Sequence, residues 1–293
     1  MSQWFAGKRV FITGGSKGIG RSSAIQMAQA GAHVGIGARG QGAIDETIAE
    51  MKKVAKPDQR FAGVAMDVTD SGSVNAGAAR ALEMLGGLDV LVCNSGAAEA
   101  GPVLDLEEDV FHRMMDLNYL GHVRAIRAFG PHLRDQGKGN IVLVTSVAAV
   151  TGFWGYGPYG ASKAAIVQMG ESLRQEMKEH GVKVQVFYPP TTDTPGFAQE
   201  TITKPDVLHV IESESAFNAA HSSDKIGREL LSAIEAGRFY NLPTWDGKLQ
   251  NFIVKHFPTI YHWIADDELA KGRKKVADMR AKGIDPKAVK LKT

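Results

Sequence analysis

Short, almost uniformly apolar segments alternate with longer helical segments over most of this sequence. Segments of this kind are expected to form strands, at residues 8–13, 33–38, 61–67, 88–93, 141–146 and 182–188. Strands that are apolar at nearly every position, instead of every second one, are typical of a parallel sheet with helices on both faces. Since parallel strands are joined by right-handed crossovers, the alternation predicts a doubly wound α/β sheet.

The composition is that of a globular protein and narrows the range of functions. The 293 residues are 44% hydrophobic and 23% charged, without a repeat or a low-complexity linker, which favours one domain. The formal net charge of +2 does not indicate a nucleic-acid-binding protein. A single cysteine, Cys93, excludes a disulfide framework and a multi-cysteine metal site, and no metal is expected. Residues 1–7 lack the features of a signal peptide and no apolar run approaches the roughly 18 residues of a membrane span, so a cytoplasmic location is expected.

The strand–helix rhythm ends after residue 188. A proline-rich stretch follows, with helices expected at 207–220 and 223–236. An excursion at this edge of the sheet is where a lid over a substrate would lie. We therefore expect a catalytic domain at residues 1–247, which includes a lid at about 190–222, and a C-terminal extension at residues 248–293.

A glycine-rich turn, Thr-Gly-Gly-Ser-Lys-Gly-Ile-Gly, joins the first expected strand to the first expected helix. Gly14 permits a tight turn, Gly18 lets the backbone approach a pyrophosphate, and Gly20 allows the helix to pack closely on the sheet. The helix N-terminus adds free N–H groups and a partial positive charge. A Rossmann-like dinucleotide site is therefore predicted, with a loop that binds no ligand as the alternative. The expected cofactor contacts in this turn are Gly14, Ser16, Lys17, Gly18, Ile19 and Gly20.

The end of the second strand indicates which dinucleotide is bound. A carboxylate there would accept hydrogen bonds from the adenosine ribose of NAD. The chain has Ala38 and Arg39 instead, and Lys17 lies in the glycine-rich turn. Two cations without a carboxylate suit a 2′-phosphate, because arginine binds phosphate through two charge-assisted hydrogen bonds. NADP(H) is the expected cofactor, and the alternative is that both cations are solvated surface charges.

Ser146, Tyr159 and Lys163 form the expected catalytic group. Tyr159 and Lys163 are four residues apart, which places them on one face of a helix, and Ser146 ends the fifth expected strand. A free tyrosine has a pKa of about 10, and a neighbouring ammonium group is expected to lower it. Tyr159 would then donate a proton to a carbonyl oxygen that Ser146 hydrogen-bonds, while hydride arrives from the nicotinamide.

These motifs, in this order from Lys8 to Gly196, resemble the short-chain dehydrogenase/reductase family. The resemblance implies Asn118 as a catalytic residue that holds a proton-relay water near Lys163. It also implies a set of cofactor contacts beyond the glycine-rich turn, which are Asp67, Val68, Asn94, Gly96, Tyr159, Lys163, Pro189, Thr192 and Thr194. The chain departs from the family pattern at Ser95, usually alanine, and at Pro190, usually glycine. Members commonly pair through their long helices, so a homo-oligomer is expected.

Some segments resemble a narrower group, the 3-ketodihydrosphingosine reductases. They are residues 118–121, 152–156, 188–197 and 203–205. The resemblance implies NADPH-dependent reduction of the C3 ketone of a long-chain sphingoid base. A long alkyl chain needs an apolar groove, and Phe153, Trp154 and Tyr156 are expected either to line one wall of it or to pack in the fold.

Other functions stay open at this point. The nearest is reduction of another hydrophobic ketone, such as a 3-oxoacyl chain or a steroid-like substrate. A nucleotide-sugar epimerase can share the tyrosine and lysine, but three residues separate Gly14 from Gly18 where epimerases usually have two. A non-catalytic NADPH-binding sensor would be expected to lose Ser146, Tyr159 or Lys163, and all three are present.

The C-terminal extension combines aromatic and basic residues. Residues 252–264 are rich in apolar and aromatic side chains, and residues 271–293 contain nine Lys or Arg against two Asp. Aromatic side chains beside cations suit a helix that lies on an anionic membrane surface. The alternative is a helix packed on the domain or on a dimer partner. Peripheral membrane contact is thus one of two expectations for this segment.

Overall fold

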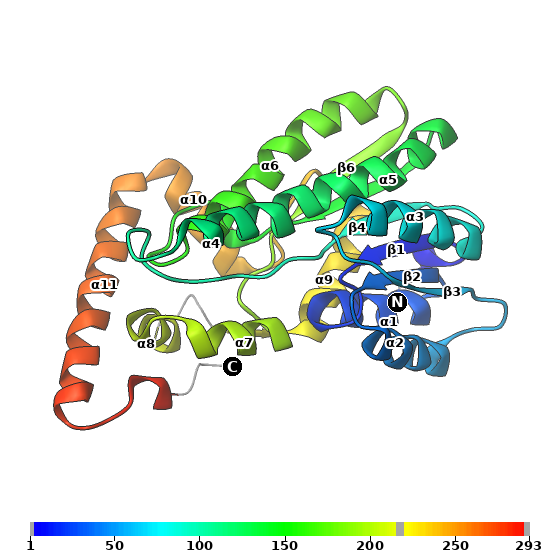
Figure 1. Cartoon of the computed structure of the whole chain (residues 1–293). Coiled ribbons are helices and arrows are strands. Elements are labelled where there is room, and N and C mark those ends of the chain that lie inside the picture. The colour runs from blue at the N-terminus through cyan, green and yellow to red at the C-terminus, as the bar shows by residue number, and fades with distance from the viewer. Residues whose placement is uncertain (1–2, 215–219, 290–293) are drawn as a thin grey trace.

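The sheet at the centre of the molecule has seven parallel strands. In the computed structural model, which describes residues 3–214 and 220–289, the strand order is β3-β2-β1-β4-β5-β6-β9. The strands are β1 (Arg9–Thr13), β2 (His33–Ala38), β3 (Phe61–Ala65), β4 (Val90–Cys93), β5 (Gly139–Val144), β6 (Val182–Phe187) and β9 (Tyr240–Asn241). Neighbouring strands pair in parallel and helices lie on both faces (Figure 1). The predicted doubly wound, Rossmann-like sheet is confirmed.

Each face of the sheet has its own helices and its own apolar core. The helices of one face are α1 (Gly18–Gln29), α2 (Gln41–Val54) and α9 (Ser223–Ala236), and those of the other are α3 (Ser71–Leu85), α5 (Gly121–Gln136) and α6 (Gly157–Lys178). Met27 and Leu230 belong to the first core, while the rings of Phe11 and Phe129 lie 4.6 Å apart in the second. Burying such a side chain contributes roughly 1.5–3 kcal/mol. The two cores therefore hold the carboxyl ends of the strands in a fixed arrangement.

A π-helix, η2 (Met115–Leu120), joins α4 (Glu108–Met114) to α5. Single π-helical turns inside α-helices often occur at functional sites, because they turn a side chain in a direction that a regular helix would not. Here the turn carries Asn118, whose side chain is fully buried. From this position the side chain of Asn118 reaches both α6 and the loop that follows β4.

The segment after β6 forms two short helices, α7 (Pro195–Thr203) and α8 (Asp206–Glu214). The hydroxyl of Thr194 caps α7 by accepting a hydrogen bond of 3.0 Å from the backbone of Phe197. Strands β7 (Thr192–Asp193) and β8 (His221–Ser222) pair with each other at the base of this segment. The helix expected at residues 207–220 is found as α8, and residues 215–219 of that expectation lie outside the described residues.

Two more helices follow β9, and both were expected only as one aromatic-rich segment. They are α10 (Trp245–His256) and α11 (Pro258–Ala281), and they are separated at Phe257 because a helix seldom continues through the residue before a proline. α11 packs against α8, where Arg280 forms an ion pair of 2.7 Å with Asp206. Within residues 3–214 and 220–289, no helix combines the length and the apolar character needed to span a bilayer. The remaining short helices are η1 (Gln3–Phe5), η3 (Val147–Ala149) and η4 (Pro286–Ala288).

Candidate active site

A cavity of about 1050 Å³ extends along the carboxyl ends of the strands and under α7, α8 and α11. It includes the ends of β1 and β4, where the strand order reverses and where ligands bind in open α/β sheets. Its volume lies at the upper end of the roughly 300–1,000 Å³ that is usual for ligand pockets. The predicted site residues that line it are Gly14, Ser16, Lys17, Gly18, Ile19, Arg39, Asp67, Val68, Asn94, Gly96, Ser146, Tyr159, Lys163, Pro189, Thr192 and Thr194.

The glycine-rich turn has the backbone conformation that the sequence predicts. Gly14 and Gly18 have φ angles of 66° and 53°, in the left-handed region that favours glycine. At Gly18 the structure adds a second reason for glycine, since a Cβ atom there would lie 2.9 Å from Cγ2 of Thr194. Gly20, which was expected to contact the cofactor, does not line the cavity. It faces the turn itself, where a Cβ atom would lie 2.4 Å from the carbonyl oxygen of Gly14, so glycine is needed there for close packing.

The start of α1 offers backbone N–H groups to the cavity. No side chain caps this helix at Lys17, and Gly18 and Ile19 of its first turn line the cavity. The first N–H groups of a helix have no partner within the helix and, with the helix dipole, favour an anionic group. The turn therefore fits the pyrophosphate of a dinucleotide.

Side chains around the nucleotide end of the cavity carry opposite charges. Lys17 and Arg39 are exposed and line this end of it. Hydrogen bonds from Thr69, above all from its backbone, hold the pKa of Asp67 below its ordinary value, and the charge of Arg39 acts in the same direction. The side chain of Asn94 donates to the carbonyl oxygen of Thr13 at 3.1 Å, which ties the end of β4 to the start of the glycine-rich turn.

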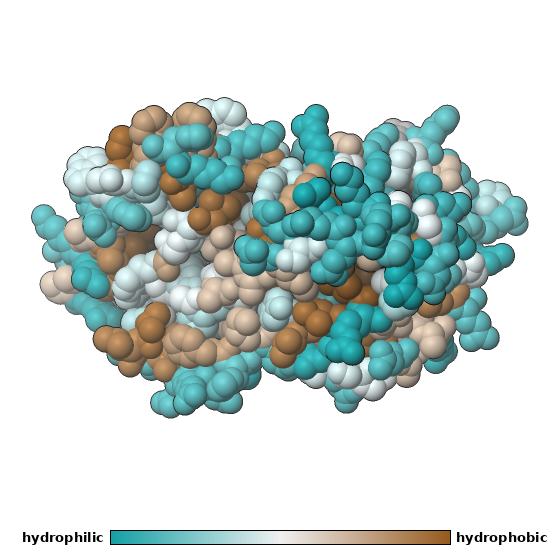
Figure 2. All heavy atoms as spheres, turned by 90° about the horizontal axis from the view of Figure 1, so that it is seen from above, coloured by the Kyte–Doolittle hydropathy of each residue, from teal (hydrophilic) through white to brown (hydrophobic). Residues whose placement is uncertain are grey.

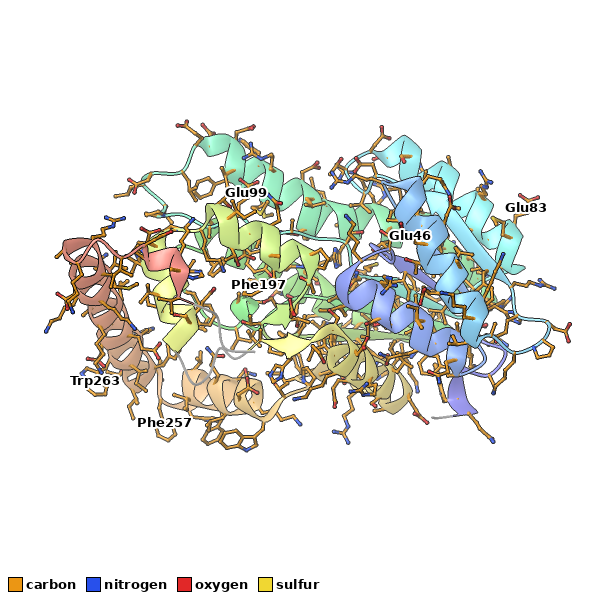
Figure 3. All side chains as sticks on the ribbon, turned by 90° about the horizontal axis from the view of Figure 1, so that it is seen from below. Glu46, Glu83, Glu99, Phe197, Phe257 and Trp263 are labelled. Atoms are coloured by element: carbon orange, nitrogen blue, oxygen red, sulfur yellow. The ribbon has the colours of Figure 1, made fainter. Side chains whose placement is uncertain are left out.

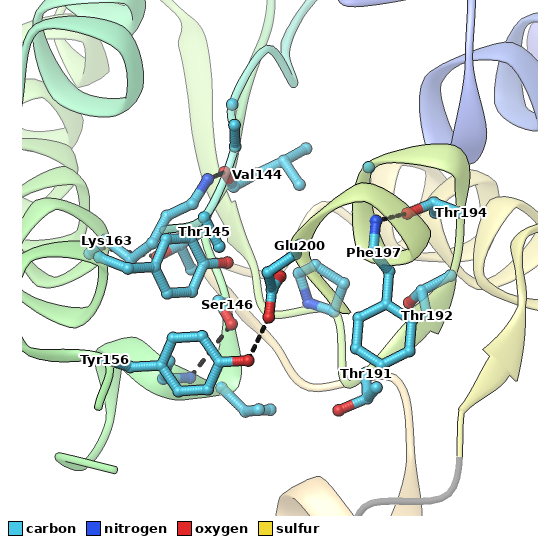
Figure 4. A pocket seen from close by; sticks show the side chains of 18 of the residues that line it. Val144, Thr145, Ser146, Tyr156, Lys163, Thr191, Thr192, Thr194, Phe197 and Glu200 are labelled. Carbon is cyan, nitrogen blue, oxygen red and sulfur yellow. Dashed lines mark hydrogen bonds between the residues drawn. The ribbon is translucent and has the colours of Figure 1, made fainter. Parts of the chain in front are cut away.

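Ser146, Tyr159 and Lys163 line the cavity near the end of β5, and Figure 4 shows Ser146 and Lys163 there. The hydroxyl of Ser146 accepts a hydrogen bond of 3.1 Å from the backbone of Ala148, and it also interacts with the phenol of Tyr159. The Nζ atom of Lys163 lies 5.8 Å from the centroid of the Tyr159 ring and donates to the carbonyl oxygen of Val144 at 3.3 Å. The three side chains thus converge on one wall of the cavity.

The pKa of Tyr159 differs from what the sequence predicts. Burial raises it to about 12, the hydrogen bond with Ser146 opposes that rise, and the charge of Glu200 adds to it. Burial also lowers the pKa of Lys163 to about 8. The expectation that the lysine lowers the pKa of the phenol is not met in this structure, because Nζ turns to the Val144 carbonyl and loss of water dominates at the ring.

Comparison with known proteins identifies the family. The family model of the short-chain dehydrogenases matches residues 8–205. The chain belongs to this family. The chain is therefore an oxidoreductase, and the family and fold imply a nicotinamide cofactor.

Curated relatives and a solved structure extend this short-chain dehydrogenase match. A 3-dehydrosphinganine reductase of Danio rerio is 36% identical over 222 residues, which cover 75% of this chain and 67% of the relative. A 3-ketodihydrosphingosine reductase of Bos taurus is 34% identical over 243 residues, which cover 82% and 72%. The structure of levodione reductase has the same fold at 19% identity, with a TM-score of 0.75 over 81% of this chain and 96% of that one. The similarity to 3-ketodihydrosphingosine reductases that the sequence suggested is confirmed.

Asn118 of this short-chain dehydrogenase lies behind the cavity wall. Its amide nitrogen donates to the Ala97 carbonyl at 3.0 Å and to the Ser162 hydroxyl at 2.9 Å, and its oxygen accepts from the Ala97 backbone at 3.0 Å. A Cβ atom on Gly96 would lie 2.7 Å from that oxygen and 3.1 Å from Nζ of Lys163. The side chain thus joins the β4 loop to α6 beside the lysine, and the water-holding role stays a prediction.

Sequence reasoning missed two groups of residues near this site. One is His122, which is buried and whose pKa falls to about 3 through burial and the nearby charge of Lys163. The other is a polar cluster between α7, α8 and the start of α6, where α7 and α8 lie in the segment expected to form a lid. It is made of Tyr156, Glu200, Lys204 and Glu212. The four-residue spacing of Glu200 and Lys204, just after the segment that resembles the family, was an available signal for the cluster.

Proposed function

We propose that this short-chain dehydrogenase is an NADPH-dependent reductase of a hydrophobic ketone, the C3 ketone of a long-chain sphingoid base. The observation that carries the proposal is the convergence of Ser146, Tyr159 and Lys163 between the glycine-rich turn and the helices α7 and α8. The reductases named among its relatives act on ketones of this class, as their names state.

The residues of the site divide the chemistry among them. Ser146 donates a hydrogen bond to the ketone oxygen and Tyr159 donates the proton that this oxygen takes up as it becomes a hydroxyl. Tyr159 carries that proton at neutral pH, because its pKa is raised to about 12. Lys163, with a pKa lowered to about 8 by burial, holds a positive charge 5.8 Å from the centroid of the Tyr159 ring. To stabilise the phenolate that proton donation leaves, its Nζ atom must turn from the Val144 carbonyl toward the phenol oxygen. The dinucleotide, when bound, supplies the hydride.

The choice of NADP(H) over NAD(H) is supported by charge at the nucleotide end. The chain has Arg39 where a carboxylate would bind the ribose of NAD, and Lys17 lines the same end. Both side chains are exposed and can turn toward a 2′-phosphate without losing a buried partner.

The lid end of the cavity is suited to an alkyl chain. Its walls carry apolar side chains from four separate segments, namely Phe153, Trp154, Phe197, Leu208, Ile211 and Leu269. Phe153 and Trp154 follow η3, and their lining of the cavity fits the expectation that this segment forms one wall. A groove of this kind also suits a 3-oxoacyl chain, which is the alternative substrate.

We also propose that the corner between α10 and α11 contacts an anionic lipid surface. Its aromatic side chains are largely exposed, with Trp263 at 69% and Phe257 at 48%. Both point away from the fold in Figure 3, and hydrophobic side chains gather at this end of the molecule in Figure 2. Lys248 and Lys255 are exposed on α10 and add positive charge. The opposite side of α11 lines the cavity, so a lipid surface here would border the proposed substrate site.

The proposal is tested by following NADPH and NADH oxidation with 3-ketodihydrosphingosine, a 3-oxoacyl thioester and a steroid ketone. We expect 3-ketodihydrosphingosine to give the highest kcat/KM and NADPH to be preferred. Arg39→Asp should reduce the NADPH preference by about tenfold or more, since it replaces a charge-assisted contact with a repulsion. An unchanged preference in the variant would contradict the cofactor assignment, and a faster reaction with another ketone would contradict the substrate assignment.

A further inference from the structure

The polar cluster of the lid is held tightly and faces the cavity. Nζ of Lys204 lies 2.6 Å from Oε2 of Glu212 and 3.1 Å from Oε1 of Glu200. The phenol oxygen of Tyr156 lies 2.8 Å from Oε1 of Glu212 and is also within hydrogen-bond distance of Glu200, and its one proton is donated to one of the two at a time. The side chain of Lys204 is fully buried, whereas Tyr156, Glu200 and Glu212 line the cavity.

The charges of this cluster do not balance. Two carboxylates face one ammonium group, and Tyr156 stays neutral because burial and the carboxylates raise its pKa. Burial also raises the pKa of Glu212, although Lys204 opposes this. Because the one phenol proton cannot serve both carboxyl groups, either a carboxyl group such as Glu212 holds a proton when no ligand is bound, or one carboxylate lacks a counter-charge. A cation that enters from the cavity side would balance the second carboxylate in either case.

The remaining charges of the cavity are sorted in the same sense. Lys17 and Arg39 lie beside one carboxylate, Asp67, at the nucleotide end, whereas the lid end carries Asp266 and Glu268 of α11 in addition to the cluster. A cavity with an excess of cations at one end and of carboxylates at the other matches an anionic dinucleotide and a cationic second ligand. The sorting is independent of the contacts within the cluster.

The cluster also lies next to the reacting atoms. The rings of Tyr156 and Tyr159 have centroids 5.8 Å apart, and the charge of Glu200 is felt at the phenol of Tyr159. Figure 4 shows Glu200 reaching from the lid toward Tyr156, close to Ser146. A cationic group bound here would sit near the ketone oxygen that Ser146 and Tyr159 hold.

We propose that Glu200 and Glu212 bind the ammonium group of an amino ketone whose amine is on the carbon next to the carbonyl. The inference rests on the proposed function and deepens it, because a sphingoid ketone has its amine at that position. The carboxylates select the amino ketone over a neutral ketone of equal chain length. Lys204 and Tyr156 are positioning residues that hold both carboxylates against the cavity.

The test compares two substrates that differ only in the amine: 3-ketodihydrosphingosine and the same hydroxy ketone without the 2-amino group. For each enzyme, the ratio of the two kcat/KM values is the readout. Glu200→Gln should lower the ratio about ten- to hundred-fold, since a hydrogen bond to a charged group is lost. Glu200→Asp, which keeps the charge, should recover part of the ratio. Asp206→Asn, which removes a lid carboxylate paired with Arg280 outside the cavity, should leave the ratio unchanged.

Binding measurements separate this inference from the proposed reaction. Sphinganine, the amino alcohol product, is titrated calorimetrically into wild type and Glu200→Gln, with unfolding temperatures measured for both. Equal affinities overturn the ammonium site even if ketones are reduced. Weaker binding by the variant supports the site even if no ketone is reduced, in which case the proposed reaction fails alone. Should Glu200→Gln not fold, Glu212→Gln is expected to show the same loss, and an unchanged ratio there would overturn the inference.

Discussion

At the scale of single residues, the site depends on two buried side chains that each carry a proton, an ammonium group and a phenol. Lys163 keeps an ammonium group where burial lowers its pKa to about 8, and Tyr159 keeps a phenol whose pKa is raised to about 12. At neutral pH both side chains are protonated, so the phenol is in the form that a ketone reductase needs. Ser146 lowers the pKa of the phenol through its hydrogen bond, and this assists release of the proton.

Replacing the acid without changing the shape of the site tests this assignment. Tyr159→Phe removes one hydroxyl and keeps the ring, so we expect turnover to fall by about 10²–10⁴-fold, the usual contribution of general acid catalysis. Binding of NADPH should be largely retained, because the glycine-rich turn is untouched. Steady-state rates and a fluorescence titration with NADPH check the two parts. A variant that reduces the ketone at the wild-type rate would remove Tyr159 from the mechanism.

At the scale of elements, the features set by neighbouring residues could be predicted from the sequence, whereas contacts between distant segments could not. The apolar strands and the turn before α1 follow from neighbouring residues, and so does the shared helix face of Tyr159 and Lys163. Strand β9 has only two residues, too few to show an apolar run, and the π-helix at 115–120 has no known local signal. The meeting of Glu200 with Glu212 depends on how α7 and α8 fold back over the cavity. Such contacts need the tertiary structure.

The corner of α10 and α11 also belongs to this scale, and its proposed lipid contact can be measured. Phe257→Ser combined with Trp263→Ser removes two exposed aromatic side chains. Because each buried aromatic contributes roughly 1.5–3 kcal/mol, binding to vesicles of phosphatidylserine and phosphatidylcholine should fall by about tenfold or more. Co-sedimentation checks the result. Met84→Ser, which alters an exposed methionine on α3, at the opposite end of the molecule from α11 in Figure 1, serves as the control. Equal binding by the double variant and the control would contradict the lipid contact.

At the scale of the whole molecule, one buried histidine makes the free energy of unfolding depend on pH. His122 is the second residue of α5, is 1% exposed, and has a pKa lowered from 6.5 to about 3. The unfolded chain therefore binds a proton at this residue more readily than the folded chain does. The resulting stability is complete above about pH 6.5 and is lost as the pH falls toward 3.

Acid titration of the unfolding free energy measures this effect. Between pH 6 and pH 4, His122 should contribute a slope of about 1.4 kcal/mol per pH unit. His122→Gln should remove that part of the slope, whatever it does to stability at neutral pH. His112→Gln, at an exposed position of α4, should leave the slope as in wild type. Urea denaturation at a series of pH values gives the slopes, and identical slopes in all three proteins would contradict the role of His122.

The contact between Thr194 and Gly18 has a consequence for how the lid moves. Thr194 caps α7, and its methyl group rests against the glycine where α1 begins. The N-cap residue of α7 is thus in contact with the turn that is expected to bind the pyrophosphate. A displacement of α7 would change this contact, so we expect a dinucleotide bound at the turn to influence the position of α7 over the other end of the cavity. The affinities for the two proposed ligands are then expected to depend on each other.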